Sequence, residues 1–281
     1  MAKPLAEDIV PELSSDALLG GRVTLLQPVK GYRAAIDPVF LAAAIPAKAG
    51  ETVLDVGVGV GAAALCLAAR VAEARVGGIE QRRELVRLAV CNAEVNGLSR
   101  RVDFMIGDLV KAPRRLAPGS FHHVMANPPF IEAGRDNRPP DEGKAAAHME
   151  GSAGLEDWLR FCLLMVRPKG SVTLIHRADR LDQILAALAG RLGEVVVFPL
   201  WPGPASATGV GDKPARRIIL RGRKGVATPL RLLPGMVLHE EGGGFTPQAE
   251  AVLRGGQGLD LSRAAGNLNR SSPRRTRNIQ P

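Results

Sequence analysis

The segment Asn127-Pro128-Pro129-Phe130 combines residue types that could hold and activate a planar amine. The amide oxygen of Asn127 can accept a hydrogen bond from an amino group, while the two prolines remove two backbone donors and stiffen the turn. The carbonyl of Pro128 is then a second fixed acceptor, and the ring of Phe130 can stack on a base or an amide. We therefore predict that Asn127, Pro128, Pro129 and Phe130 are catalytic; a rigid surface turn is the alternative.

The amine chemistry explains why two acceptors are useful. An exocyclic amine on an aromatic ring is a poor nucleophile because its lone pair is spread into the ring. Two acceptors that bind both amine hydrogens favour a more tetrahedral nitrogen, and their fixed dipoles stabilise the positive charge that develops during transfer. A methyl donor held in line then requires little besides positioning. No metal is needed, and the widely spaced Cys66, Cys91 and Cys162 do not indicate one.

The glycine-rich run Asp55-Val56-Gly57-Val58-Gly59-Val60-Gly61 is a second candidate site. Glycines permit positive φ and let backbone amides approach a ligand, so a strand that turns through them into a helix is typical of nucleotide-like ligands. Glu80 ends the next strand, where it can accept both hydrogens of a ribose diol. The run also satisfies the dinucleotide fingerprint, so by itself it leaves nicotinamide cofactors and S-adenosylmethionine both open.

Two acidic residues favour S-adenosylmethionine. Asp55 precedes the first glycine by two residues, where its carboxylate would repel a pyrophosphate and attract an ammonium group. Asp108 follows the predicted strand at 102–106 and can accept a hydrogen bond from an adenine amino group, although an aspartate in this place is also a common helix cap.

The elements that carry these residues alternate between apolar strands and amphipathic helices. This alternation predicts a mostly parallel sheet with helices on both faces. Strands are expected at 22–26, 52–56, 75–79, 102–106, 122–126, 171–175, 194–199 and 216–220, and helices at 37–45, 62–69, 82–95, 155–166 and 180–188. Because no long helix separates the last two strands, we expect an antiparallel finish. The predicted fold class is α/β, with a Rossmann-like sheet of about seven strands.

Positive charge is concentrated in two parts of the chain. The net charge is +9, and residues 261–281 contain five arginines and no acid. Residues 213–231 form a second basic run without an acid. RNA as a partner is one explanation, and a solvated surface is the other. The candidate RNA-binding residues are Lys30, Arg33, Arg135, Arg138, Arg216 and Arg217.

Together these features resemble the class I S-adenosylmethionine-dependent methyltransferases with an Asn-Pro-Pro-aromatic motif, and more specifically the bacterial tRNA1(Val) (adenine-37 N6) methyltransferase family. The resemblance covers roughly residues 20–255, including 27–37, the glycine run, Glu80, Asp108, the turn 127–130, His148 before 155–158, and 229–254. Family members often have arginine where this chain has Ala147. The resemblance implies S-adenosylmethionine as cofactor and adenine in tRNA as substrate. The predicted cofactor-binding residues are Asp55, Val56, Gly57, Val58, Gly59, Gly61, Glu80, Gln81, Asp108, Leu109 and Asn127, with Tyr32 and Asp37.

The expected organisation follows from this resemblance and from the length of 281 residues, which fits one large domain with appendages. We expect a flexible leader at 1–20, a methyltransferase domain at 21–258, and a basic tail at 259–281 that is disordered. The domain would consist of an N-terminal segment, 21–50, and a Rossmann-like core, 51–258. No apolar run is long enough to span a membrane and the first residues do not read as a signal peptide, so we expect a cytoplasmic protein without a membrane partner.

Several functions fit the same four-residue turn. Adenine N6 and guanine N2 in RNA and the side-chain amide of a protein glutamine all present a planar nitrogen with two hydrogens. The basic character favours RNA, whose base must be swung out to reach such a turn. A non-catalytic RNA-binding module is a less favoured alternative, because Asp55, Glu80, Asp108 and Asn127 are all intact. A nicotinamide-dependent oxidoreductase is also less favoured, because Asp55 would repel a pyrophosphate. The oligomeric state is left open.

Overall fold

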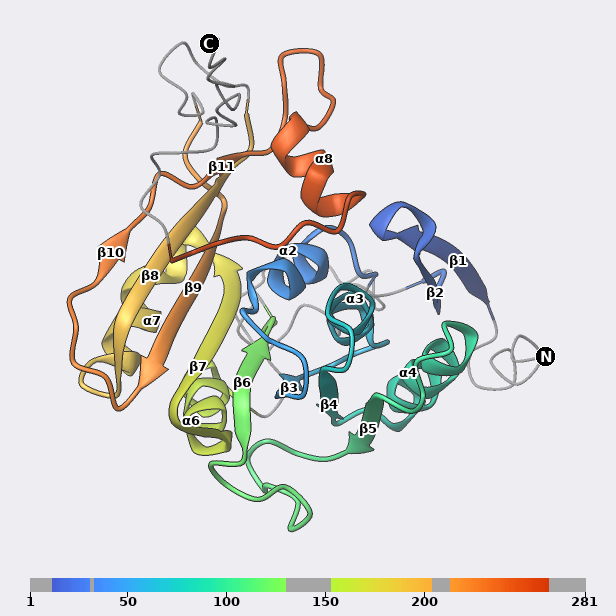
Figure 1. The fold of residues 1–281 in the computed structure, drawn as a ribbon, viewed down its shortest axis with the longest axis horizontal. Coiled ribbons are helices and arrows are strands. Elements are labelled where there is room, and N and C mark those ends of the chain that lie inside the picture. The colour runs from blue at the N-terminus through green and yellow to red at the C-terminus, as the bar shows by residue number, and fades with distance from the viewer. Residues whose placement is uncertain (1–11, 31–32, 130–152, 204–212, 263–281) are drawn as a thin grey trace, which may run out of the picture.

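The computed structural model describes residues 12–30, 33–129, 153–203 and 213–262, and Figure 1 shows their arrangement around one large β-sheet. The strands of this sheet are β3 (Thr52–Val56), β4 (Arg75–Glu80), β5 (Val102–Ile106), β6 (Phe121–Ala126), β7 (Val166–Arg177), β8 (Leu192–Trp201), β9 (Arg217–Lys224), β10 (Arg231–Leu232) and β11 (Met236–Val237). Their order is β10-β8-β9-β7-β6-β3-β4-β5, and β11 also pairs with β8.

The sheet is parallel from β5 to β7, its late strands β10 and β11 pair in parallel with β8, and β9 is antiparallel to its neighbours. β3 pairs in parallel with β4 and β6, β4 with β5, and β6 with β7. β9 is inserted antiparallel between β7 and β8. The predicted Rossmann-like fold with an antiparallel finish is therefore confirmed. The short β10 and β11 were not predicted, because two residues carry no periodic signal.

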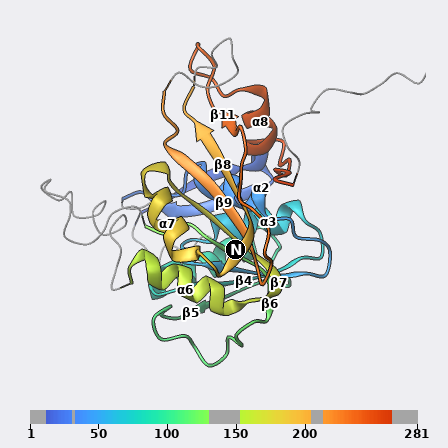
Figure 2. The same cartoon turned by 90° about the vertical axis from the view of Figure 1, so that its left-hand side faces the viewer.

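Helices cover both faces of the sheet, as Figure 2 shows from the side. They are α2 (Asp37–Ala44), α3 (Ala62–Arg70), α4 (Arg83–Val95), α6 (Leu155–Met165), α7 (Leu181–Leu188) and α8 (Pro247–Leu253), with short 3-10 helices η1 (Leu19–Gly21) and η2 (Ala178–Arg180). Residues of α2, α3, α4 and α8 build one hydrophobic cluster, and residues of α6 and α7 build the other. Val53, Leu54 and Val56 are fully buried, as expected for a parallel strand covered on both faces.

The predicted leader is wrong from Leu13 onward. Leu13–Leu18 form β1, which pairs antiparallel with β2 (Val23–Pro28) in a separate two-stranded sheet. This hairpin is fixed to α4, since the backbone of Leu26 hydrogen-bonds to Asn92 of that helix and the backbone of Thr24 to Asn96 at its C-cap. The sequence of β1 is too polar to predict a strand, and its order depends on contacts with residues far along the chain.

The predicted start of the tail at residue 259 is also wrong. The amide of Leu259 donates to the carbonyl of Ala43 at 2.7 Å, and Leu261 is completely buried in the first cluster. The domain therefore extends at least to this point. Residues 263–281, which include the five arginines, lie outside the described residues. Among the helices that are described, none is long and apolar enough to cross a membrane.

Candidate active site

The predicted site residues meet at the carboxyl edge of three neighbouring strands. Val56, the last residue of β3, pairs with Ile79 of β4 on one side and with Ala126 of β6 on the other. The residues that follow these strands, Gly57 and Asn127 among them, therefore emerge side by side. This edge is where open α/β sheets bind their ligands.

The glycine loop is held by its own backbone against β4. Gly57, Gly59 and Gly61 have φ values of 71°, 55° and 93°, a region in which side chains other than glycine are strained. The amides of Gly57 and Val58 both donate to the carbonyl of Ile79, at 2.8 and 3.0 Å, and the Gly61 amide donates to Val58 at 2.9 Å. These amides are thus used within the protein and fix the shape of the loop.

Asp55 is the electrostatic centre of the loop. It is 3% exposed, and its Oδ2 has no hydrogen-bond partner among the described residues. Burial, together with the nearby negative charge of Glu80, raises the pKa of Asp55 to about 8, although the backbone of Ala64 opposes this shift. A buried carboxyl without a full set of partners is costly, and a nearby cation both stabilises its charge and lowers its pKa. Asp55 therefore fits the ammonium group of S-adenosylmethionine.

The space beside the loop is also suitable for a ligand. A Cβ atom built on Gly59 would meet no atom of the described chain within 4 Å. One carboxylate oxygen of Glu80 accepts from the Gly59 amide at 3.1 Å, and the other accepts from the Arg82 amide at 2.9 Å. Glu80 thus lies across the mouth of the loop. Gln81 beside it is exposed.

Asp108 and Leu109 follow β5, the next strand along the same edge. The Asp108 carboxylate accepts from the Val110 amide at 2.8 Å, a local turn contact of the kind that the sequence left open. Leu109 packs against the second hydrophobic cluster and lines a hollow of about 540 Å³ between this loop and α6. In the described contacts, then, Leu109 is associated with α6 rather than with the glycine loop.

The Asn-Pro-Pro turn begins where β6 ends. Pro128 is buried, Asn127 and Pro129 are half-buried, and the side-chain oxygen of Asn127 is shielded from solvent. The turn is therefore part of the packed edge of the sheet and not an exposed surface turn. Four residues of the predicted sites lie outside the described residues: Tyr32, Phe130, Arg135 and Arg138.

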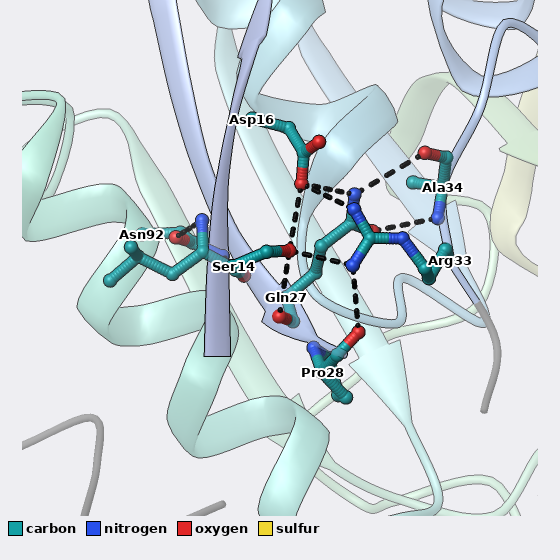
Figure 3. A network of polar contacts seen from close by, with 8 residues as sticks. Ser14, Asp16, Gln27, Pro28, Arg33, Ala34 and Asn92 are labelled. Carbon is teal, nitrogen blue, oxygen red and sulfur yellow. Dashed lines mark hydrogen bonds and ion pairs between the residues drawn. The ribbon is translucent and has the colours of Figure 1, made fainter. Parts of the chain in front are cut away.

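The N-terminal segment is tied to the hairpin by the polar network in Figure 3. The guanidinium of Arg33 donates to Asp16 at 2.8 Å and to the hydroxyl of Ser14 at 2.6 Å. The side chain of Gln27 donates to Asp16 at 2.9 Å and accepts from the Ala34 amide at 2.8 Å. The described contacts of Arg33 are all within the protein, so its guanidinium helps to place the segment that leads into α2.

The remaining predicted residues near this segment are also partly paired. Asp37, at the start of α2, accepts from Nε of Arg217 at 3.0 Å, which joins a predicted cofactor residue to a predicted RNA-binding residue. Lys30 is largely exposed and lies 3.6 Å from Glu12. Arg216 is exposed at the start of β9.

Sequence reasoning missed three residues that shape this edge. Asn92, completely buried on α4, donates to the carbonyls of Leu26 and Val60 at 2.8 and 2.9 Å and so joins the hairpin to the glycine loop. Trp158 of α6 lies so close to Gly57 that a Cβ there would overlap its indole. His176 is buried near the end of β7. A lone amide on an apolar helix face was the available signal for Asn92; Trp158 reads as an ordinary core residue.

The geometry agrees with the comparisons to known proteins. Residues 35–139, which contain both the glycine loop and the Asn-Pro-Pro turn, match the family described as the methyltransferase small domain. Over these residues the chain is therefore similar to that family. The chain is 32% identical over 154 residues to a Porphyromonas gingivalis protein named tRNA1(Val) (adenine(37)-N6)-methyltransferase, covering 52% of this chain and 60% of that protein. It therefore spans less than two thirds of the length of this relative.

A second relative and a solved structure extend the likeness. The Aeromonas hydrophila protein of the same name is 29% identical over 191 residues, which are 68% of this chain and 76% of that one. A crystal structure described as a predicted O-methyltransferase from Agrobacterium tumefaciens has a TM-score of 0.65 and 25% identity, covering 80% of this chain and 98% of that chain. The predicted resemblance to methyltransferases and the Rossmann-like fold are confirmed.

Proposed function

We propose that this methyltransferase transfers a methyl group from S-adenosylmethionine to an exocyclic amino nitrogen, namely N6 of an adenine in tRNA. The observation that carries the proposal is the register of β3 against β6, which sets the buried carboxyl of Asp55 and the turn that starts at Asn127 on neighbouring strand ends. The names of the two relatives support adenine in tRNA as the substrate.

The cofactor would be held by the loop and by the acidic residues along the edge. Asp55 supplies a negative charge for the ammonium group, and Glu80 supplies acceptors for a ribose diol next to the open side of Gly59. Asp108, at the end of β5, is placed to accept from the adenine ring of the cofactor. S-adenosylmethionine supplies, when bound, an electrophilic methyl group on a sulfonium sulfur.

The turn prepares the nucleophile. The side-chain oxygen of Asn127 and the carbonyl of Pro128 accept the two hydrogens of the target amine, which localises the lone pair on nitrogen and stabilises the charge that develops there. Because Pro128 is buried in the packed edge, these acceptors need little reorganisation during transfer. After methylation the nitrogen is strongly acidic, and its extra proton passes to solvent water.

RNA would be bound by positive charge around this edge. Lys30 and Arg216 are exposed and suited to phosphate contacts, and Arg217, which follows Arg216, is paired with Asp37. The arginines of 263–281 would add contacts that weaken with salt. A tRNA substrate also implies a cytoplasmic location.

The test is methyl transfer to tRNA by the variant Asn127→Ala. Loss of one fixed acceptor is expected to lower kcat about 100-fold or more, with the Kd for S-adenosylmethionine nearly unchanged. Transfer from radiolabelled S-adenosylmethionine and calorimetry measure the two quantities. Asn96→Ala is the matched control, because Asn96 bonds only to the hairpin and α4 backbone in the described structure. Near-normal turnover of Asn127→Ala would refute the assigned role.

The identity of the base is tested separately by mass spectrometry of tRNA nucleosides after reaction. N6-methyladenosine is the expected product. If the product is N2-methylguanosine, or if a protein glutamine is methylated and no RNA is labelled, the proposed amine chemistry stands but the substrate is not adenine.

A further inference from the structure

His176 is a buried polar residue beside the Asn-Pro-Pro turn that the proposed chemistry does not use. It is 1% exposed, and both of its ring nitrogens are shielded from solvent. β7 lies parallel to β6, with Leu174 opposite Ala126. Continuing this register by two residues sets His176 level with Pro128. An imidazole in such a place requires a polar partner.

Two backbone groups act on the ring as hydrogen-bond acceptors, and both oppose the fall in its pKa: those of Arg177 and of Pro129. The second of them belongs to the turn. Because proline has no N–H, the group that faces the ring must be the carbonyl of Pro129, which accepts from a ring N–H. Burial, with the positive charge of Arg180, lowers the pKa of His176 to about 4, so the ring is neutral at physiological pH.

This contact affects which of two proline carbonyls is available to accept from the target amine. The two prolines leave successive carbonyls at Pro128 and Pro129 with no backbone donor from either residue. A target amine requires one of them in a fixed direction. A donor that occupies the Pro129 carbonyl holds the turn in one orientation and leaves the Pro128 carbonyl for the substrate.

We propose that His176 is a positioning residue, which binds the Pro129 carbonyl and thereby aims the Pro128 carbonyl at the amine. The inference rests on the proposed function of the turn. A neutral ring suits this role, because a cation beside the turn would oppose the positive charge that develops on the amine nitrogen.

The experiment compares His176→Phe, which keeps a ring without a donor, with His176→Gln, which keeps a donor. Misplacement of the turn is expected to lower kcat for tRNA methylation about 10- to 100-fold in His176→Phe, with the Kd for S-adenosylmethionine within about twofold of the wild type. His176→Gln is expected to recover much of the lost kcat. His239→Phe, at a ring stacked on Phe245, is the control for a general histidine-to-phenylalanine effect.

The outcomes separate positioning from packing. A wild-type kcat in His176→Phe would overturn the proposal. So would a His176→Gln variant that is folded, with an unchanged Tm, but as slow as His176→Phe, since packing and not a hydrogen bond would then be responsible.

A second measurement needs no substrate. Long-range ¹H–¹⁵N NMR of wild-type protein should show His176 as one neutral tautomer with a protected ring N–H between pH 5.5 and 8. A ring that titrates near its ordinary pKa would refute the contact even if the variants do not fold. If wild-type protein methylates no tRNA, the proposed function fails, while a protected ring still supports the contact itself.

Discussion

The amino and carboxyl edges of the central sheet both carry buried polar residues, but the two sets differ in their hydrogen-bond partners. At the amino edge, His123 lies between Glu51, at 3.0 Å from its Nε2, and the Ser171 hydroxyl, at 2.8 Å from its Nδ1. This is the order of groups found in hydrolytic triads. Ser171 is only 3% exposed, however, so its hydroxyl is closed to a substrate. At the carboxyl edge, by contrast, Oδ2 of Asp55 has no partner in the described part of the chain.

Shifted pKa values do not separate the two edges. Burial lowers the pKa of His123 although Glu51 opposes the shift, and the Lys48 amide and His123 lower the pKa of Glu51 although burial opposes them. The difference is in the partners. Polar groups that satisfy one another stabilise a fold, whereas a buried group left incomplete beside open space is a stronger indication of a binding site.

The largest expected effect concerns the glycines of the two edges. Gly57 and Gly119 have nearly equal φ values of 71° and 68°, but a Cβ at Gly57 would overlap Trp158, whereas at Gly119 it would meet no described atom within 4 Å. Gly57→Ala should lower the free energy of unfolding by about 3–5 kcal/mol, from backbone strain plus overpacking. Gly119→Ala should cost only about 1–2 kcal/mol, the strain alone. Chemical denaturation measures both, and equal losses would show that Trp158 does not constrain the loop.

The next effect is on cofactor binding. Asp55→Asn keeps the shape of the side chain and removes its charge, so the Kd for S-adenosylmethionine should rise about 100-fold, or about 3 kcal/mol. Calorimetry measures it, with Glu51→Gln at the opposite edge as the control that should leave Kd unchanged. An unaltered Kd in Asp55→Asn would remove the basis for assigning the ammonium group to this carboxyl.

Much of the carboxyl edge could be predicted from sequence because its signals are local. The glycine run, the ends of the apolar strands and the Asn-Pro-Pro turn each lie within a few consecutive residues, and their side-by-side placement follows from a parallel sheet. The predicted roles of these residues stay predictions until variants are measured.

What could not be predicted depends on contacts between distant residues. β1 is ordered through its hairpin partner, and Leu26 of that partner binds Asn92, which is 66 residues away. β9 continues past its predicted end at Leu220 because its charged side chains reach nearby carbonyls: Lys224, for instance, donates to Leu163 and Val166 at 2.7 and 3.0 Å. In sequence, such a basic run is indistinguishable from a solvated loop.

A smaller effect is the pH dependence of stability without ligand. The pKa of Asp55 is raised in the folded state from 3.8 to about 8. Its contribution to stability is therefore fully present below pH 3.8 and is lost as the pH rises through 8. Between pH 6 and 8.5 the wild type should lose on the order of 2 kcal/mol more than Asp55→Asn. Thermal unfolding at both pH values tests this, and parallel pH profiles of the two proteins would contradict it.

The smallest effect should come from Ser171, whose contact with His123 resembles part of a hydrolytic triad. Ser171→Ala removes the hydroxyl that bonds His123 and should lower the free energy of unfolding by only about 1 kcal/mol. Because this edge lies at the far end of the strands from the Asn-Pro-Pro turn, kcat/KM for methyl transfer should not change. A loss of methyl transfer in Ser171→Ala, with stability preserved, would mean that the two edges are coupled and that complete hydrogen bonding does not mark a purely structural cluster. An unchanged rate would leave the incomplete partner set of Asp55 as the feature that distinguishes the functional edge.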